Sequence, residues 1–305
     1  DKQKMLQIVK NIQTGLSDHV ASLDWMSEQT KARAQEKLSS FIIKIGYPDK
    51  WKDYSTLEID AQKSYYQNLR EASLWSMRDN LSKLGRPVDK TEWGMTPQTV
   101  NAYYNPTTNE ICFPAGILQP PFFNPNADDA VNYGAIGVVI SHEMTHGFDD
   151  QGRLFDKDGN LNNWWTEEDA ASFKAKADKL VAQFDAVQIQ DGLYANGSAT
   201  LGENIADQGG LRIAFTAMKN SFGGKEPKPI DGFTAEQRFY LAYAILWGQN
   251  ITPQECARLT LLDVHSLGRN RVNVSLRNLQ DFFDAFDIKE GDKMFRPEEE
   301  RVVIW

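Results

Sequence analysis

The hydrophobic residues near the start of the chain recur with the spacing of one helical face. They fall at i, i+3, i+4 and i+7 positions and comprise Met5, Ile8, Val9, Ile12 and Leu16. Ser27 stands as an N-cap before a charged run of helix-forming residues, 28–38. A further helical pattern extends over about residues 64–84 and stops before a Gly and a Pro. Residues 1–90 are therefore predicted to form a helical scaffold.

The pattern changes after residue 91. Residues 100–104 and 110–113 are short and β-prone, and the segment between them is rich in turn-forming residues, which predicts a β-hairpin. Asp128 or Asp129 is then expected to cap a long apolar helix. Two more helices are predicted further on, from N-cap residues of known preference: Thr166, and Thr234 with Gln237 in a capping box. The chain is therefore predicted to be α+β and predominantly α.

Composition and charge narrow the functional class. The 305 residues carry a net charge of −9, which argues against nucleic acid as a partner because phosphate binding needs an excess of Lys and Arg. No apolar run reaches the roughly 18 residues typical of a membrane-spanning helix. The two cysteines, Cys112 and Cys256, exclude a disulfide scaffold and are expected to be isolated thiols. Any signal or anchor is expected upstream of Asp1, or already removed.

The predicted apolar helix contains the sequence His-Glu-Met-Thr-His at positions 142–146. Residues four apart lie on one helical face, so His142 and His146 can bind one zinc ion, while Glu143 can reach a water molecule beside it. A chance pattern in a surface helix is the alternative. The preceding Val138-Val-Ile140 makes the helix buried, however, and buried ionisable groups need a partner. The motif therefore predicts one Zn²⁺ per chain.

A catalytic zinc needs a third protein ligand, and the candidates are Glu203 and Asp207, which lie four residues apart on one helical face. One of the two carboxylates can bind the metal while the other accepts the free N–H of a ligand histidine. Such an acidic pair is more often simply solvated. The surrounding apolar residues and the Gly209-Gly210 pair instead indicate a packed helix. For Asp149 and Asp150, a role at the site and simple solvation at a helix end remain equally open.

These motifs together resemble the neprilysin family of zinc endopeptidases, in its bacterial, endopeptidase O-like form. The resemblance extends over essentially the whole chain and rests on His142–His146, Glu203–Asp207, Asn101–Tyr104, Phe113–Phe123, Val264–Ser266 and Trp305. It implies a thermolysin-like zincin (gluzincin) catalytic domain over residues 91–305, cutting oligopeptides on the amino side of hydrophobic residues. It also implies that this chain is the C-terminal catalytic half, and that a helical N-terminal lobe of the same protein is its partner.

The resemblance also implies roles for further residues. Glu203 would be the third zinc ligand, and Glu143 would be the general base. Asp207 would orient a ligand histidine, and His265 would donate a hydrogen bond to the oxyanion. Asn101 and Ala102 would hydrogen-bond an extended substrate from a strand edge. Arg271 would bind a substrate carbonyl on the leaving-group side, with Arg269 as the alternative if the register differs.

Two other functions remain open at this point. A zinc aminopeptidase would use the same metal geometry but needs an acidic group for the free α-amine, and the usual Gly-x-Met-Glu-Asn block is absent from the sequence. A non-catalytic, zinc-stabilised binding or scaffold domain would have four protein ligands and no need for Glu143. The small number of cysteines favours a bacterial source. An extracytoplasmic location, periplasmic or attached to the cell envelope, is then expected, with the cytoplasm as the alternative.

Overall fold

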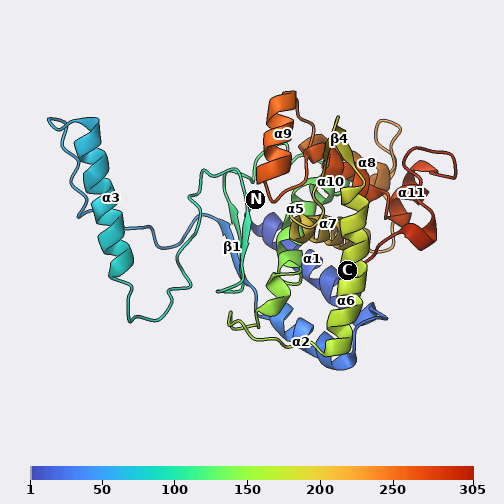
Figure 1. The fold of residues 1–305 in the computed structure, drawn as a ribbon, viewed down its shortest axis with the longest axis horizontal. Helices are drawn as coiled ribbons and strands as arrows, with labels where there is room; N and C mark the ends of the chain where they lie inside the picture. Colours follow the sequence, from blue (N-terminus) through green and yellow to red (C-terminus); the bar gives the residue numbers. More distant parts are fainter. Residues whose placement is uncertain (1) are drawn as a thin grey trace.

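The computed structural model describes residues 2–305, which are mostly helical with small sheets (Figure 1). The helices are α1 (Lys2–Ser22), α2 (Glu28–Ser39), α3 (Tyr65–Leu81), α4 (Asp129–Asn132), α5 (Val138–His146), α6 (Glu167–Asp185), α7 (Leu201–Ser221), α8 (Ala235–Leu246), α9 (Pro253–Leu262), α10 (Gly268–Leu276) and α11 (Gln280–Phe286). In residues 2–305, no helix combines the length and apolar character needed to span a membrane. Cys112 and Cys256 are both free thiols.

The main sheet joins strands from distant parts of the chain. It consists of β1 (Ile42–Gly46), β3 (Glu110–Pro114) and β2 (Tyr103–Asn105), in that order, with β1 parallel and β2 antiparallel to β3. The predicted hairpin is thus confirmed, although β2 begins at Tyr103. Strand β1 was not predicted, because its partner strand lies far along the chain. Strands β4 (Gln188–Gln190) and β5 (Leu193–Tyr194) form a separate hairpin.

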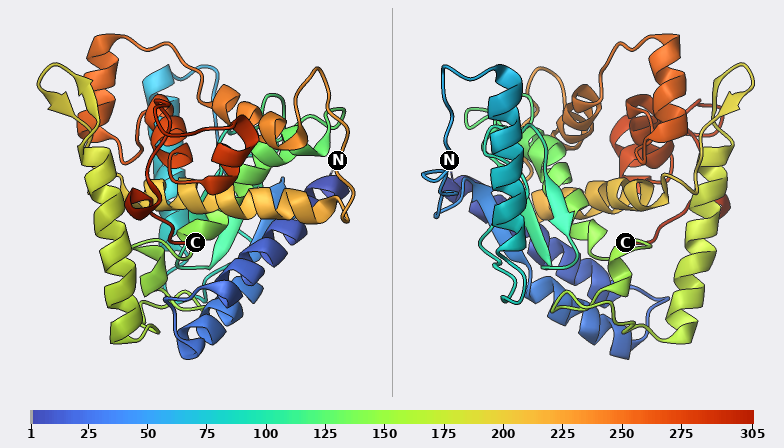
Figure 2. Two further views of the ribbon diagram at one scale, coloured as in Figure 1. Left: turned by 90° about the vertical axis from the view of Figure 1, so that its right-hand side faces the viewer. Right: turned by 60° about the vertical axis from the view of Figure 1, so that its left-hand side comes forward.

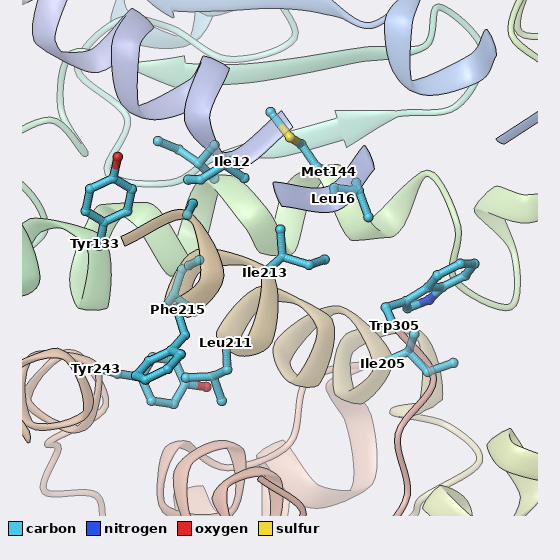
Figure 3. Close-up of a cluster of buried hydrophobic side chains, with 14 of the residues drawn as sticks. Ile12, Leu16, Tyr133, Met144, Ile205, Leu211, Ile213, Phe215, Tyr243 and Trp305 are labelled. Atoms are coloured by element: carbon cyan, nitrogen blue, oxygen red, sulfur yellow. The ribbon is translucent and has the colours of Figure 1, made fainter. Parts of the chain in front are cut away.

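Helices α1, α5 and α7 pack around one hydrophobic cluster, with α7 in contact with both of the others. Figure 3 shows side chains from these three helices meeting in this cluster, together with Trp305 near the chain end. The apolar residues predicted to form one face of α1 are all buried there. The labelled members are Ile12, Leu16, Tyr133, Met144, Ile205, Leu211, Ile213, Phe215, Tyr243 and Trp305.

The close approach of α7 to α5 depends on two glycines. A Cβ at Gly210 would lie 3.0 Å from the backbone nitrogen of His142, and one at Gly209 would lie 2.7 Å from the Thr145 side chain. Any side chain at either position would push the helices apart. The Gly209-Gly210 pair therefore sets the spacing at which the acidic face of α7 meets the histidines of α5.

The predicted helix starts are confirmed at Ser27, Thr166 and Thr234, each of which accepts a hydrogen bond from a backbone N–H in the first turn. Asp128 caps α4, as predicted. One helix differs from the prediction of a continuous α-helix, because a π-helical segment, Tyr133–Gly137, joins α4 to α5. This segment releases the N–H of Ile136, which donates to the carbonyl of Phe122 in the preceding loop.

Residues 49–100, here called the arm, leave the sheet between β1 and β2 and carry α3 away from the other helices (Figures 1 and 2). No residue of α3 is buried. The arm exposes large apolar side chains along its length, including Trp51, Ile59, Tyr65, Tyr66, Leu69, Leu81, Leu84 and Val88. The predicted helix over residues 64–84 is confirmed, within a few residues of its end.

Candidate metal centre

Helices α5 and α7 place His142, His146 and Glu203 around one point. The ring Nε2 atoms of the two histidines lie 3.0 Å apart. Glu203 Oε2 lies 3.2 Å from His142 Nε2, and Glu203 Oε1 lies 3.5 Å from His146 Nε2. One ligand atom from each residue falls within 4.8 Å of the other two, as a single metal ion requires. The three ligands predicted from the sequence are therefore brought together.

The far side of each imidazole ring is held by a carboxylate. Asp207 Oδ1 lies 3.0 Å from His142 Nδ1, and Asp149 Oδ2 lies 2.7 Å from His146 Nδ1. A carboxylate acceptor keeps the ring proton on Nδ1, which leaves the lone pair on Nε2. Two lone pairs then face each other beside a carboxylate, an arrangement that repels itself unless a cation lies between them.

Burial and hydrogen bonding support this fit to a cation. Glu203 Oε2 is buried and has no hydrogen-bond donor within the described residues. Burial lowers the pKa of His142, but the contacts with Asp207 and Glu203 and their negative charges outweigh this effect and raise the pKa to about 10. Without a metal ion the ring therefore takes up a second proton, so the site attracts positive charge. The Glu203 pKa is lowered, because its histidine neighbours outweigh the effect of burial. The donor set of two imidazoles and one carboxylate is that of a catalytic zinc site.

Glu143 lies beside this centre and is only 7% exposed. Its carboxylate makes no hydrogen bond to any other described residue, and it lines the cleft that opens onto the metal ligands. Burial raises its pKa, while the positive charges of His142, His146 and Arg271 oppose the shift. The Glu143 carboxylate is thus available to a water molecule in the cleft and has a higher proton affinity than an exposed glutamate.

Arg271 is held beside the site by two hydrogen bonds and an aromatic ring. Its Nε and one terminal nitrogen each lie 2.7 Å from an oxygen of Asp207. Its guanidinium carbon lies 3.9 Å from the centroid of the Trp247 ring. Arg271 is buried but still lines the cleft, whereas Arg269 is exposed and lies outside the cleft lining. Of the two arginines, Arg271 is therefore the one placed to contact a substrate in the cleft. Asp207 links it to His142.

His265 lies at the rim of the cleft and its side chain is 45% exposed. Its Nε2 lies 3.4 Å from Glu203 Oε1, so the ring faces the metal ligands. Asp263 accepts both the His265 backbone N–H at 3.0 Å and the ring Nδ1 proton at 2.7 Å. The Nδ1 contact fixes the ring orientation and leaves Nε2 pointing into the cleft.

The cleft has a volume of about 780 Å³ and runs between the β2 edge of the sheet and helices α5 and α7. Asn101 and Ala102 line it just before β2 begins. Strand β2 is hydrogen-bonded to β3 on one side only. Both residues, predicted to lie at a strand edge, are found along the wall of the cleft.

A family model described as peptidase family M13 matches residues 101–302, well over half of the chain. The chain belongs to peptidase family M13. A second model of the same description matches residues 1–48. The resemblance drawn from the metal motifs is thereby confirmed, and in this M13 chain the residues His142, His146 and Glu203 form the zinc site. The arm lies between the two matched spans.

Named relatives share sequence with this M13 chain over nearly its entire length. Neutral endopeptidase of Lactococcus lactis subsp. lactis is 39% identical over 305 residues, which cover 100% of this chain and 46% of the relative. Neprilysin-11 of Caenorhabditis elegans is 41% identical over 298 residues, which cover 94% of this chain and 35% of the relative. The chain thus spans less than half the length of these relatives.

Solved structures agree with the sequence match. The zinc metalloprotease Zmp1 of Mycobacterium tuberculosis, in complex with an inhibitor, superimposes with a TM-score of 0.96 at 45% identity, over 100% of this chain and 47% of that one. A PepO structure from Lactobacillus gives a TM-score of 0.92 at 33% identity, over 100% of this chain and 47% of that one. The M13 catalytic-region fold is therefore shown.

Sequence reasoning missed several residues that complete the site. Trp247, which stacks on Arg271, carried no signal because its spacing fits any packed helix end. Asp263 was also missed, although an aspartate two residues before a histidine can form such a turn. Asp149 had been left undecided, and its contact with His146 now assigns it to the metal centre.

Proposed function

We propose that the protein is a zinc-dependent endopeptidase that cuts oligopeptides on the amino side of hydrophobic residues. The observation that carries the proposal is the open cleft beside a three-ligand zinc site. Structural zinc sites are usually closed by four protein ligands, whereas this one opens onto a cleft of about 780 Å³ that Glu143 lines. That difference disfavours a purely structural zinc domain.

The preference for hydrophobic residues is inferred from the walls of the cleft. Near His142 they are formed by the apolar side chains of Ile117, Phe122, Val138 and Val139. Val138 and Val139 directly follow the π-helical segment. The backbone N–H of Ile136 in that segment donates to the carbonyl of Phe122. An apolar side chain entering this region would be removed from water, which stabilises binding by about 25 cal/mol per Å² of buried apolar surface.

The substrate backbone would be recognised by a separate set of contacts. An extended peptide beside the free edge of β2 can exchange main-chain hydrogen bonds regardless of its sequence. Asn101 and Ala102 line the cleft directly before β2 begins, and they extend this edge along the cleft. Arg271 carries N–H donors beyond those used by Asp207, and these can bind a substrate carbonyl on the leaving-group side.

The chemistry divides among the remaining residues. Zinc, when bound, supplies Lewis-acid activation of water and of the substrate carbonyl. Glu143 takes a proton from the attacking water on its carboxylate and passes it to the leaving amine. His265, whose ring is held by the contact between Nδ1 and Asp263, donates in its imidazolium form from Nε2 to the negative charge that develops on the substrate carbonyl oxygen. Asp207 keeps both His142 and Arg271 in position for these steps.

We also infer that a further lobe of the same polypeptide covers the arm. The arm exposes a series of large apolar side chains, and the relatives are more than twice as long as this chain's matched span. A single segment of a protein surface rarely exposes so many large apolar side chains without a partner. Self-association of the isolated chain through the arm, measured by sedimentation, would be expected, whereas the complete polypeptide should remain unassociated through this surface.

The test of the function is digestion of a defined peptide mixture, with mass analysis of each cut position. Cleavage inside the peptides before Phe, Leu, Ile or Val, abolished by a zinc chelator and restored by zinc, is expected. Release of single N-terminal residues would instead indicate an aminopeptidase. Zinc binding without any hydrolysis by the complete polypeptide would favour the scaffold function. Phe122→Ala should shift the preference towards larger side chains, while the exposed Ile245→Ala serves as its control.

A further inference from the structure

Lys37 of α2 is one of the most deeply buried charged residues in the described chain, with only 1% of its surface exposed. Its Nζ donates to three carbonyl oxygens, those of Gly147 at 2.6 Å, Gly152 at 2.7 Å and Phe155 at 2.8 Å. All three belong to the turn that follows the zinc-binding helix α5. Lys37 is therefore fixed from α2 onto a segment more than 100 residues away in the sequence.

This contact matches the donor number of a protonated lysine. An ammonium group has three N–H donors and no acceptor, and three carbonyls receive them. No carboxylate of the described residues lies within ion-pair distance of Lys37 Nζ. Burial lowers the pKa of Lys37 to about 7, and the negative charges of Asp149 and Asp156 oppose this shift. The Gly147 carbonyl lies at the C-terminal end of α5, where the helix dipole favours a cation.

The same turn carries Asp149, whose carboxylate orients a zinc ligand. Asp149 Oδ2 contacts His146 Nδ1 at 2.7 Å, while its Oδ1 accepts the backbone N–H groups of Gln151 and Gly152 at 2.9 and 2.6 Å. Lys37 thus binds backbone carbonyls of the same turn whose backbone N–H groups bind the Asp149 carboxylate. The fit is tight, because a Cβ at Gly152 would lie 1.7 Å from the His146 carbonyl oxygen.

We propose that Lys37 is a positioning residue for the zinc site: its ammonium group holds the 147–155 turn so that Asp149 can fix the orientation of His146. The residue touches neither metal nor substrate and acts only through this turn. A second contact also links Lys37 to the cleft: its Nζ lies 5.8 Å from the ring centroid of Tyr104 in β2, the strand at the cleft edge. The turn and the cleft edge therefore share one buried cation.

The inference rests on the zinc site of the proposed function and deepens it, but it does not depend on peptide specificity. Its test therefore measures zinc affinity directly, by competition with a chromophoric chelator, in the protein as it is naturally expressed. Failure of the endopeptidase assay would leave this test intact. Failure of this test would leave the endopeptidase proposal intact.

The experiment is a double-mutant cycle between Lys37 and Asp149. Lys37→Met keeps a similar side-chain length but removes the charge and the donors, and it is expected to weaken zinc binding by roughly 10–100-fold. In an Asp149→Ala background, the same change should add no more than about twofold, because the residue it acts through is already missing. Lys31→Met, on the same helix and paired only with Glu28 at 3.0 Å, should leave zinc affinity unchanged.

Three results would overturn the proposal. The first is unchanged zinc affinity in a folded Lys37→Met protein. The second is an equal loss in both backgrounds, which would show that Lys37 contributes to general stability and does not act through Asp149. If Lys37→Met does not fold by circular dichroism, Lys37→Gln, a neutral side chain with two N–H donors, replaces it in the cycle. Loss of the fold in both variants would be the third, because the ammonium would then stabilise the whole chain.

Discussion

Helices α5 and α3 are formed by different physical means. Helix α3 begins with a complete capping box, in which Ser64 and Gln67 satisfy each other's backbone N–H groups. Its other contacts are local, such as the tilted ring pair of Tyr54 and Trp75, with centroids 5.1 Å apart. Helix α5 has no side-chain cap at all and continues from a π-helical segment. It is held instead by packing against α7 and α1.

The two helices differ in how much of their stability comes from tertiary packing. Most of the stability of a helix in a protein comes from packing of an apolar face, and α3 has no buried residue to supply it. Seven residues of α5 are buried, among them His142 and Glu143. Burying ionisable groups is costly unless they are partnered, and Asp207 and Asp149 are the partners of His142 and His146. The orientation of both histidine rings is therefore set by carboxylates from the packed structure around α5.

The largest contrast between the two regions should appear in catalysis. Glu143→Gln keeps the shape of the side chain but removes the base, so hydrolysis should fall by about 10²–10⁴-fold while zinc content is unchanged. The matched arm variant Glu71→Gln should have wild-type activity. Initial rates on one peptide, with zinc measured in the same samples, provide the check. Substantial turnover by the Glu143 variant would assign the base role elsewhere.

Stability should separate the regions almost as clearly. Leu211 of α7 is fully buried in the cluster of Figure 3, so Leu211→Ala should lower the free energy of unfolding by about 2–5 kcal/mol. Leu69 of α3 is 49% exposed, and Leu69→Ala should change it by only about 0.5 kcal/mol. Urea titration measures both. A comparable loss at Leu69 would mean that the arm is buried against something in solution.

Asp207→Ala should weaken zinc binding by roughly 10–100-fold without abolishing the site, because His142 loses the partner that orients its ring. The arm offers a matched aspartate, since Asp79 pairs with Lys52 at 2.8 Å on an exposed surface. Asp79→Ala should bind zinc like the wild type. Chelator competition gives both values, and equal affinity in all three proteins would show that the contact between Asp207 and His142 does not contribute to zinc binding.

A smaller effect is expected at Arg271, which would contribute binding shared by the ground and transition states. In Arg271→Met, KM should rise more than kcat falls, and short peptides should lose most. Arg78→Met on α3 and Arg269→Met serve as comparisons that should leave both constants near the wild-type values. A fall in kcat at constant KM would place Arg271 with the oxyanion donors. An effect confined to the Arg269 variant would move the substrate contact by two residues.

Local patterns in the sequence predicted much of the fold and the three metal ligands. The four-residue spacing of His142 and His146, and the N-caps at Ser27, Thr166 and Thr234, depend only on neighbouring residues and therefore show in the sequence. Strand β1 and the π-helical segment were missed, because partners distant in the chain stabilise them.

The supporting residues of the site were harder to predict for the same reason. In the sequence Lys37 resembles Lys31 six residues earlier, since both belong to a charged helix. Only the tertiary structure shows that one Nζ is enclosed by three carbonyls and the other pairs with Glu28 at the surface. Asp149 likewise could not be told from a solvated helix end until its contact with His146 was seen.

The central claim is that His142, His146 and Glu203 bind one zinc ion, and metal analysis of purified protein with and without Glu203 tests it most directly. The wild type should contain about one zinc per chain, as a three-ligand site with an open position requires. Glu203→Ala should lose most of its zinc after dialysis against a weak chelator. Wild-type zinc content and affinity in the Glu203→Ala protein would contradict the assignment.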